Sequence, residues 1–186
     1  MTFVVRQAVP SDAMAMGVIH VAAWRSAYTG VMPDAYLDEL DATSFGLRWE
    51  ASLREGTPGS TVTVALTDDR VVAMCAVGAL RGRETDDPTG ELMMLNADPS
   101  TFGSGAAVAL HTEAVHALAE QGHRSAALWV VDRNPRARRF YEREGWAADG
   151  VERVDEIGGS PIHELRYVRQ IEEARSGRSG RRSGLG

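Results

Sequence analysis

The sequence is poor in cysteine and in basic charge, and each shortage excludes a class of protein. Its one cysteine, Cys75, cannot form a disulfide within the chain. The 20 lysine and arginine residues are outnumbered by 26 aspartate and glutamate residues, which gives a formal net charge of -6. General nucleic-acid-binding domains usually carry a basic face, so this balance predicts no nucleic-acid partner.

Long apolar runs and metal-binding patterns are also missing. No apolar run approaches the roughly 20 residues that a membrane-spanning helix needs, and no charged-then-apolar leader precedes the first expected strand. We therefore expect a cytoplasmic protein with no membrane partner. The five histidines do not show the spacing of a zinc site, so no metal is expected; they are His20, His111, His116, His123 and His163.

The composition suits a soluble globular protein of one domain. The chain has 186 residues, of which 44% are hydrophobic and 25% are charged. From residue 171 onward the sequence becomes rich in Glu, Arg, Ser and Gly without apolar periodicity. We expect a folded domain over residues 1–169 and a disordered polar tail over 170–186.

The pattern of apolar residues predicts an α/β fold. Strands are expected at 2–8, 61–66, 71–78, from 91, 124–131, 147–154 and 162–168, and helices at 13–29, 32–40, 44–53, 106–121 and 135–144. A polar connection is expected over 81–89. This order of elements indicates a sandwich of helices around a mixed sheet.

Two neighbouring segments are candidates for a functional site. In the first, Phe102-Gly-Ser-Gly-Ala-Ala107 leads from a strand into an alanine-rich helix. Glycine and alanine leave the first N–H groups of a helix unshielded, and these groups together with the helix dipole attract an anion such as a pyrophosphate. An ordinary strand-to-helix turn explains the glycines equally simply. The second segment, Asn134 to Trp146, follows the next strand and carries an asparagine, a Phe-Tyr-Glu sequence and a glycine.

With these two segments, the chain resembles the GCN5-related N-acetyltransferase (GNAT) family from about Phe3 to about Val168. The family pattern in the first segment is Arg or Gln, two variable residues, Gly, a variable residue, and then Gly or Ala. The second segment carries the family's more specific pattern, matched here by Asn134, Ala137, Phe140, Tyr141, Glu142 and Gly145. Phe102 replaces the usual Arg or Gln, and losing that polar contact is expected to weaken the hold on the pyrophosphate.

The resemblance implies a fold and a cofactor site. The fold is a three-layer α/β sandwich with a mixed, mostly antiparallel central sheet, splayed where acetyl-CoA enters. In the family, the backbone of the splayed strand aligns the pantetheine arm, and here Leu95, Asn96 and Ala97 match that strand. The other implied cofactor residues are Phe102, Gly103, Ser104, Gly105, Ala106, Ala107, Asn134, Ala137 and Tyr141. Asn134 is also suited to capping the helix that follows it, and one side chain can serve either role.

Acetyl transfer from a thioester to an amine requires a proton for the departing thiolate and a base for the amine. Tyr141 stands where the family has its general acid, although two adjacent core aromatics would also explain Phe140 and Tyr141. Glu91 matches an acidic residue often found at the entry of the splayed strand, where it would take the amine proton through a water. A carboxylate at a strand end is also commonly just solvated.

The acceptor is expected to meet the first two helices. Trp24, Arg25 and Tyr28 belong to an opening that resembles one branch of the family. Aromatic side chains can form the wall of an acceptor pocket, and Arg25 could pair with an acceptor carboxylate. A core role explains Trp24 equally well.

The leading hypothesis is transfer of an acetyl group from acetyl-CoA to a primary amine of a small molecule, by direct attack in a ternary complex. The alternatives are a non-catalytic acyl-CoA-binding or sensor module, and an acetyltransferase that modifies protein N-termini or lysines. A homodimer is compatible with the resemblance, because dimers are common in the family.

Overall fold

The computed structural model describes residues 2–80 and 89–171. The predicted tail beyond residue 171 and most of the connection predicted over 81–89 lie outside the described residues. The elements are β1 (Val4–Gln7), η1 (Pro10–Asp12), α1 (Ala13–Tyr28), α2 (Asp34–Glu39), α3 (Ala42–Glu55), β2 (Ser60–Thr67), β3 (Arg70–Ala79), β4 (Thr89–Ala97), η2 (Pro99–Thr101), α4 (Ala106–Glu120), β5 (Ser125–Val131), α5 (Pro135–Arg143), β6 (Ala147–Ile157) and β7 (Ser160–Gln170).

The strands form one mixed sheet of seven strands in the order β1-β2-β3-β4-β5-β7-β6. Neighbouring strands are antiparallel except β4 and β5, which are parallel. Asp68 and Asp69, both with positive φ, form the turn of the β2–β3 hairpin, as a tight two-residue hairpin requires. These features confirm the predicted α/β class and the mostly antiparallel sheet.

The sheet opens between its two parallel strands. β4 pairs with β5 only over residues 89–91, opposite 125–127. Along its other edge, β4 changes register against β3 so that Ala76 faces Met94 while Val77 faces Leu92. Met93 is therefore an extra residue, and such a β-bulge bends the strand that carries it. The bulge lies just past the last β4–β5 pair, and beyond it the two strands separate, which confirms the predicted splay.

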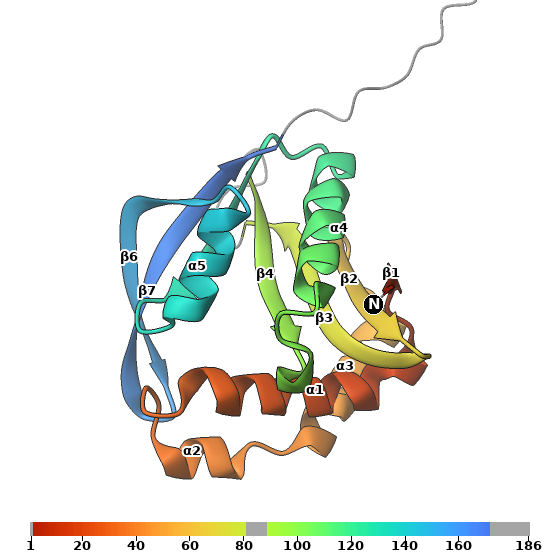
Figure 1. Cartoon of the computed structure of the whole chain (residues 1–186), viewed down its shortest axis with the longest axis horizontal. Coiled ribbons are helices and arrows are strands. Elements are labelled where there is room, and N and C mark those ends of the chain that lie inside the picture. The colour runs from red at the N-terminus through yellow and green to blue at the C-terminus, as the bar shows by residue number, and fades with distance from the viewer. Residues whose placement is uncertain (1, 81–88, 172–186) are drawn as a thin grey trace, which may run out of the picture.

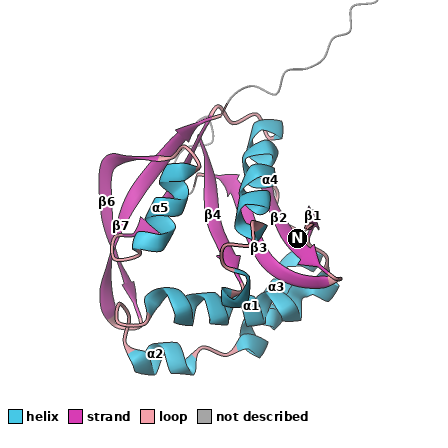
Figure 2. Ribbon diagram, in the orientation of Figure 1, coloured by secondary structure: helices cyan, strands magenta, loops and turns pink. Residues whose placement is uncertain are grey.

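Helices cover both faces of the sheet (Figures 1 and 2). α4 packs against β2, β3 and β4 on one face, and α5 lies beside it on the far side of β4 in the view of Figure 1. α1 packs against β3 and β4 on the opposite face and is backed by α3. Each face has its own apolar core, built around Leu110, Leu118 and Tyr167 under α4 and α5, and around Met16, Ile19 and Met74 under α1.

Two glycines fix the position of α1. A Cβ atom added to Gly17 would collide with the backbone of Ala42 and Gly46 on α3, and one added to Gly46 would collide with Met14. The two helices can approach this closely only because neither residue has a side chain. This packing holds α1 so that its C-terminal half reaches the opening of the sheet. None of the helices within the described part of the chain is long and apolar enough to cross a membrane.

Candidate active site

A cavity of about 740 Å³ lies where β4 and β5 separate. Residues from both faces of the sheet contribute to it. The residues from α1 are His20, Ala23, Trp24, Ala27 and Tyr28, and those from the sheet are Met93, Met94, Leu95, Asn96, Ala97, Trp129, Val130, Val131 and Glu164. The turn before α4 and the start of α4 contribute Thr101, Phe102, Gly103, Gly105, Ala107 and Val108. The residues from α5 and its N-cap are Asn134, Arg136, Ala137, Arg139, Phe140, Tyr141 and Arg143.

The turn before α4 has the geometry of an anion cradle. Gly103 and Gly105 have φ of 78° and 98°, in the left-handed region that favours glycine, and Gly105 is the N-cap of α4. The helix is 15 residues long, so its dipole and its first unpaired N–H groups point positive charge at the cavity. This donor set fits a pyrophosphate, which is the part of a coenzyme A that the sequence predicts here.

Two residues predicted for the cofactor do not line the cavity. Ala106 is 1% exposed and belongs to the core under α4. The Ser104 hydroxyl oxygen accepts a hydrogen bond from the Ala106 N–H at 3.4 Å, so this side chain supports the helix start. A contact from Ala106 to a cofactor would therefore have to come from the backbone, whereas the Ser104 hydroxyl keeps its O–H as a donor.

The free edge of β4 is the second part of the cofactor side. Leu95, Asn96 and Ala97 all line the cavity, and past Glu91 their strand has no β5 partner. An extended chain can add to such an edge as an extra strand. The Asn96 amide nitrogen is buried and has no hydrogen-bond partner among the described residues, and a buried polar group in that state favours a ligand that supplies an acceptor.

Asn134 is a helix cap that also lines the cavity. Its side-chain oxygen accepts a hydrogen bond from the Ala137 N–H at 3.1 Å, and Pro135 occupies the first position of α5, as predicted. The capping bond uses the Oδ1 atom and leaves the Nδ2 donor available. Capping is therefore confirmed, and contact with the cofactor stays a prediction.

Tyr141 lies at the centre of this arrangement. Its side chain is 9% exposed, lies in the core beneath α4 and α5, and lines the cavity. Its hydroxyl makes no hydrogen bond with any described residue, so it is free to bond a ligand. Burial raises the pKa of Tyr141, with smaller contributions from Cys75 on β3 and Tyr28 on α1. The hydroxyl therefore stays protonated at neutral and moderately alkaline pH, as a proton donor must be.

Glu91 is not brought to the cavity. It is the last residue of β4 that pairs with β5, its side chain is 2% exposed, and it is not among the cavity-lining residues. The sequence pattern placed it at the strand entry correctly, but the paired part of the sheet encloses it. Its role as a base stays a prediction, and burial away from the cavity does not favour it.

The face of the cavity on the α1 side is aromatic. Trp24 and Tyr28 from α1 pack edge to face, with ring centroids 5.3 Å apart, and Trp129 comes from β5. Glu164 on β7 is the acidic side chain on this side, and its Oε2 accepts a hydrogen bond from Arg153 Nε at 2.6 Å. Burial raises the pKa of Tyr28 to about 12, and the Glu164 carboxylate adds to that shift.

His20 also faces this side. Its ring stacks on Phe45 and Trp24, with centroid distances of 4.0 and 5.2 Å. Both ring nitrogens are buried without a hydrogen-bond partner among the described residues. Burial lowers the pKa of His20 to about 4, helped by Arg48, so the ring is neutral at physiological pH.

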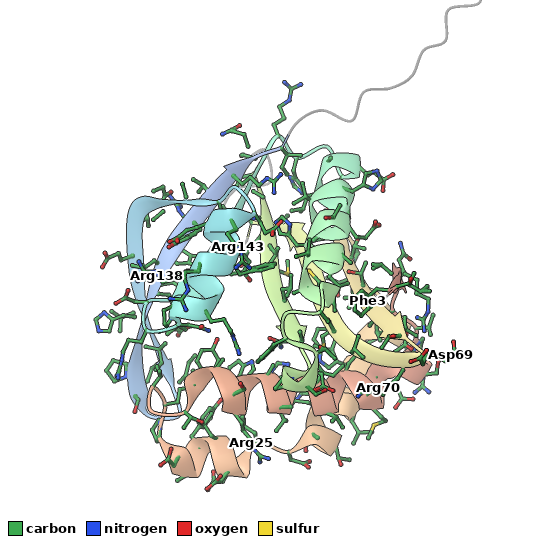
Figure 3. The ribbon with its side chains drawn as sticks, in the orientation of Figure 1. Phe3, Arg25, Asp69, Arg70, Arg138 and Arg143 are labelled. Atoms are coloured by element: carbon green, nitrogen blue, oxygen red, sulfur yellow. The ribbon has the colours of Figure 1, made fainter. Side chains whose placement is uncertain are left out.

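Arg25 lies outside the cavity, which does not favour its predicted role in binding the acceptor. Its guanidinium donates hydrogen bonds to the carbonyl oxygens of Leu37, Asp38 and Leu40, at 2.9 to 3.2 Å. Figure 3 shows it between α1 and α2. Because Arg25 follows Trp24 directly, the helix turns it away from the cavity by about 100°. It closes the end of α2 and does not line the cavity.

The sequence reasoning missed several cavity residues, among them His20, Trp129, Arg136 and Glu164. His20 precedes Trp24 by four residues, and this helical spacing places both side chains on one face. That signal was available. Trp129 and Glu164 come from different strands, and no sequence spacing relates them. In the described part of the chain, no cluster of three or more His, Cys, Asp or Glu is arranged to hold a metal ion.

The sheet opens between two parallel strands, with a glycine turn on one side and a buried tyrosine in the gap, and this arrangement fits an acyl-CoA-dependent transferase. The chain belongs to the acetyltransferase (GNAT) family, whose model matches residues 21–146. This confirms the family and the class of enzyme predicted from the sequence, with acetyl-CoA as co-substrate.

Known proteins match most of the chain. It is 28% identical over 161 residues to the uncharacterized N-acetyltransferase YuaI of Bacillus subtilis, covering 83% of this chain and 90% of YuaI. Among solved structures it resembles the PaiA N-acetyltransferase of Thermoplasma acidophilum in complex with coenzyme A, with a TM-score of 0.66, 15% identity and coverage of 91% and 99%. It also resembles YncA of Salmonella typhimurium with acetyl-CoA, with a TM-score of 0.69, 16% identity and coverage of 96% and 99%. These structural likenesses show the fold.

Proposed function

We propose that the protein transfers an acetyl group from acetyl-CoA to the primary amine of a small molecule, by direct attack in a ternary complex. The observation that carries this proposal is the hydroxyl of Tyr141, which lies in the opening of the sheet and has no hydrogen-bond partner among the described residues. The α4 and α5 side of the cavity would hold acetyl-CoA through the turn before α4 and the free edge of β4. The aromatic α1 side would hold the acceptor. Both substrates could then meet without a covalent enzyme intermediate.

The reaction conserves charge and protons with Tyr141 as the acid. The neutral amine nitrogen attacks the thioester carbon, so a C–N bond forms and the C–S bond breaks. The departing sulfur takes the proton of the Tyr141 hydroxyl and leaves as the thiol. The nitrogen loses one proton, which restores the tyrosine by way of solvent. The products are the N-acetylated amine and coenzyme A.

The chemistry of the α1 side indicates which amines fit. Aromatic faces of Trp24, Tyr28 and Trp129 attract apolar groups and cations. The arginines that line the cavity, Arg136, Arg139 and Arg143, all belong to α5 on the cofactor side. With Arg25 turned away, Glu164 is the charged side chain that lines the acceptor side in the described part of the chain. Arg153, which pairs with Glu164 and lies over the ring of Trp129, is not among the cavity-lining residues. We infer that the acceptor is an apolar amine without a carboxylate beside the amino group.

Matched acceptors test this proposal. An arylalkylamine and its α-amino acid counterpart differ only in the carboxylate, so the ratio of their kcat/KM values reports this group alone. We expect the arylalkylamine to be preferred by tenfold or more. Peptides with free N-termini or lysines belong in the same panel. Thiol release with peptides only, or with amino acids in preference to amines, would overturn the small-molecule assignment.

Phe102 keeps a second function open, because a loop that lacks its phosphate-contacting side chain would suit a non-catalytic acyl-CoA-binding module. Calorimetry with coenzyme A and an assay for thiol release separate the two functions. A binding module would bind coenzyme A and release no thiol with any amine. The predicted homodimer is tested separately by light scattering on the purified protein.

A further inference from the structure

The turn before α4 provides no positive side chain for a pyrophosphate. Position 102 is phenylalanine, and Gly103 and Gly105 have no side chains. A helix N-terminus contributes roughly half an elementary charge, whereas a pyrophosphate diester carries about two negative charges. Backbone N–H groups at this turn therefore leave much of the ligand's charge uncompensated, unless a cation comes from another element.

Arg136 is placed to supply that cation. It is the second residue of α5, it lines the cavity, and its Cζ atom lies 3.7 Å from the centre of the Phe102 ring. The ring face attracts the guanidinium and so holds it against the turn. The guanidinium then lies near the place that a polar side chain at position 102 would occupy. Phe102 is 41% exposed, so packing in the core does not account for a large apolar side chain at this position.

The donors of Arg136 are available. Arg136 makes no hydrogen bond and no ion pair with any described residue. Arg138, two positions later, is committed elsewhere: it pairs with Asp132 at 2.8 Å and donates to the Tyr167 hydroxyl at 3.3 Å. Arg138 is therefore held away from the cavity by its partners, whereas Arg136 lines the cavity and lies against the turn. A guanidinium with free donors matches two phosphate oxygens at once.

We propose that Arg136, held against the ring of Phe102, binds the pyrophosphate of acetyl-CoA and replaces the Arg or Gln that other members of the family carry at the position of Phe102. This inference rests on the proposed cofactor site and assigns to it a residue from a different element. Phe102 then serves as a platform for the arginine. Its presence does not mean that the turn has lost its ability to bind the pyrophosphate.

Calorimetric titration with coenzyme A and with dephospho-coenzyme A tests the proposal. R136M keeps the length of the side chain and removes the charge, and we expect its Kd to rise about ten- to hundredfold for both ligands. R133M is the matched control, because Arg133 lies three residues earlier, carries the same charge and does not line the cavity. Its Kd should stay within threefold of the wild-type value.

A second test with Phe102 distinguishes the proposed pair from a general effect of removing charge. We expect F102A to raise the Kd a few-fold, and to have no further effect when R136M is already present, because the two residues act as one unit. Circular dichroism confirms that each variant is folded.

Several results would overturn the assignment. They are an unchanged Kd in R136M, equal losses in R136M and R133M, and a loss for coenzyme A that dephospho-coenzyme A does not show, which would place Arg136 on the 3′-phosphate. If the wild-type protein bound no coenzyme A at all, the proposed function would fail as well. If the wild-type protein bound coenzyme A and R136M bound it with the same Kd, this inference would fail and the proposed function would stand.

Discussion

Replacing Tyr141 by phenylalanine removes one oxygen atom from the cavity and leaves the ring in place. The hydroxyl has no hydrogen-bond partner among the described residues, so its removal leaves no described polar group unpaired. We expect the free energy of unfolding to change by less than about 1 kcal/mol. The anion cradle before α4 lies on a different element, so the Kd for coenzyme A should change by no more than threefold.

The effect on the chemical step should be large. General acid catalysis typically contributes about 10²- to 10⁴-fold to the rate, which corresponds to about 3–5 kcal/mol of transition-state stabilisation. We expect kcat of Y141F to fall by a factor in this range. Because burial raises the pKa of Tyr141 above the ordinary tyrosine value of 10.0, the wild-type rate should show no alkaline fall due to this group below about pH 10.

The assay follows thiol release at saturating acetyl-CoA with the best amine of the panel. Y36F is the matched control, because Tyr36 belongs to α2 and does not line the cavity; its kcat should equal that of the wild type. A Y141F variant that retains kcat within threefold would refute the acid role. A variant that loses coenzyme A binding or stability would show that the hydroxyl is structural.

Three further predictions concern residues with structural roles. For Asn134, we expect N134A to lose about 0.5–2 kcal/mol of stability with the cap; N134S should restore stability but not the Kd for coenzyme A, and full recovery of both would limit Asn134 to capping. For Arg25, we expect R25M to lose about 1–3 kcal/mol in urea unfolding, because three carbonyls lose a charged donor, while the KM for the amine changes less than threefold; a tenfold rise in KM at unchanged stability would restore Arg25 to the acceptor site. For His111, burial and Arg169 lower the pKa from 6.5 to about 4. The unfolded chain therefore binds a proton that the folded chain does not, and stability should fall by about 3 kcal/mol as the pH drops from 6.5 to 4. H111Q should remove this contribution and leave that of His20, whose pKa burial also lowers to about 4, and an unchanged slope would contradict the prediction.

Local patterns in the sequence determined much of the fold. Helices and strands follow from the periodicity of apolar residues, since side chains repeat every 3.6 residues in a helix and every two in a strand. Capping by Asn134 and the glycine turn before α4 involve atoms within a few residues of one another. Both were therefore predictable from short segments, and so was the position of Tyr141 on its short helix.

Only the tertiary structure decided which side chains share the cavity. Trp24, Trp129 and Glu164 come from a helix and two strands, and only the order of the strands in the sheet brings them together. Glu91 and Arg25 show the opposite case, because residues distant in the sequence enclose the first and bind the second. Arg136 reaches Phe102 across the gap between α5 and the turn before α4. A contact of this kind depends on how whole elements pack, which spacing along a chain does not encode.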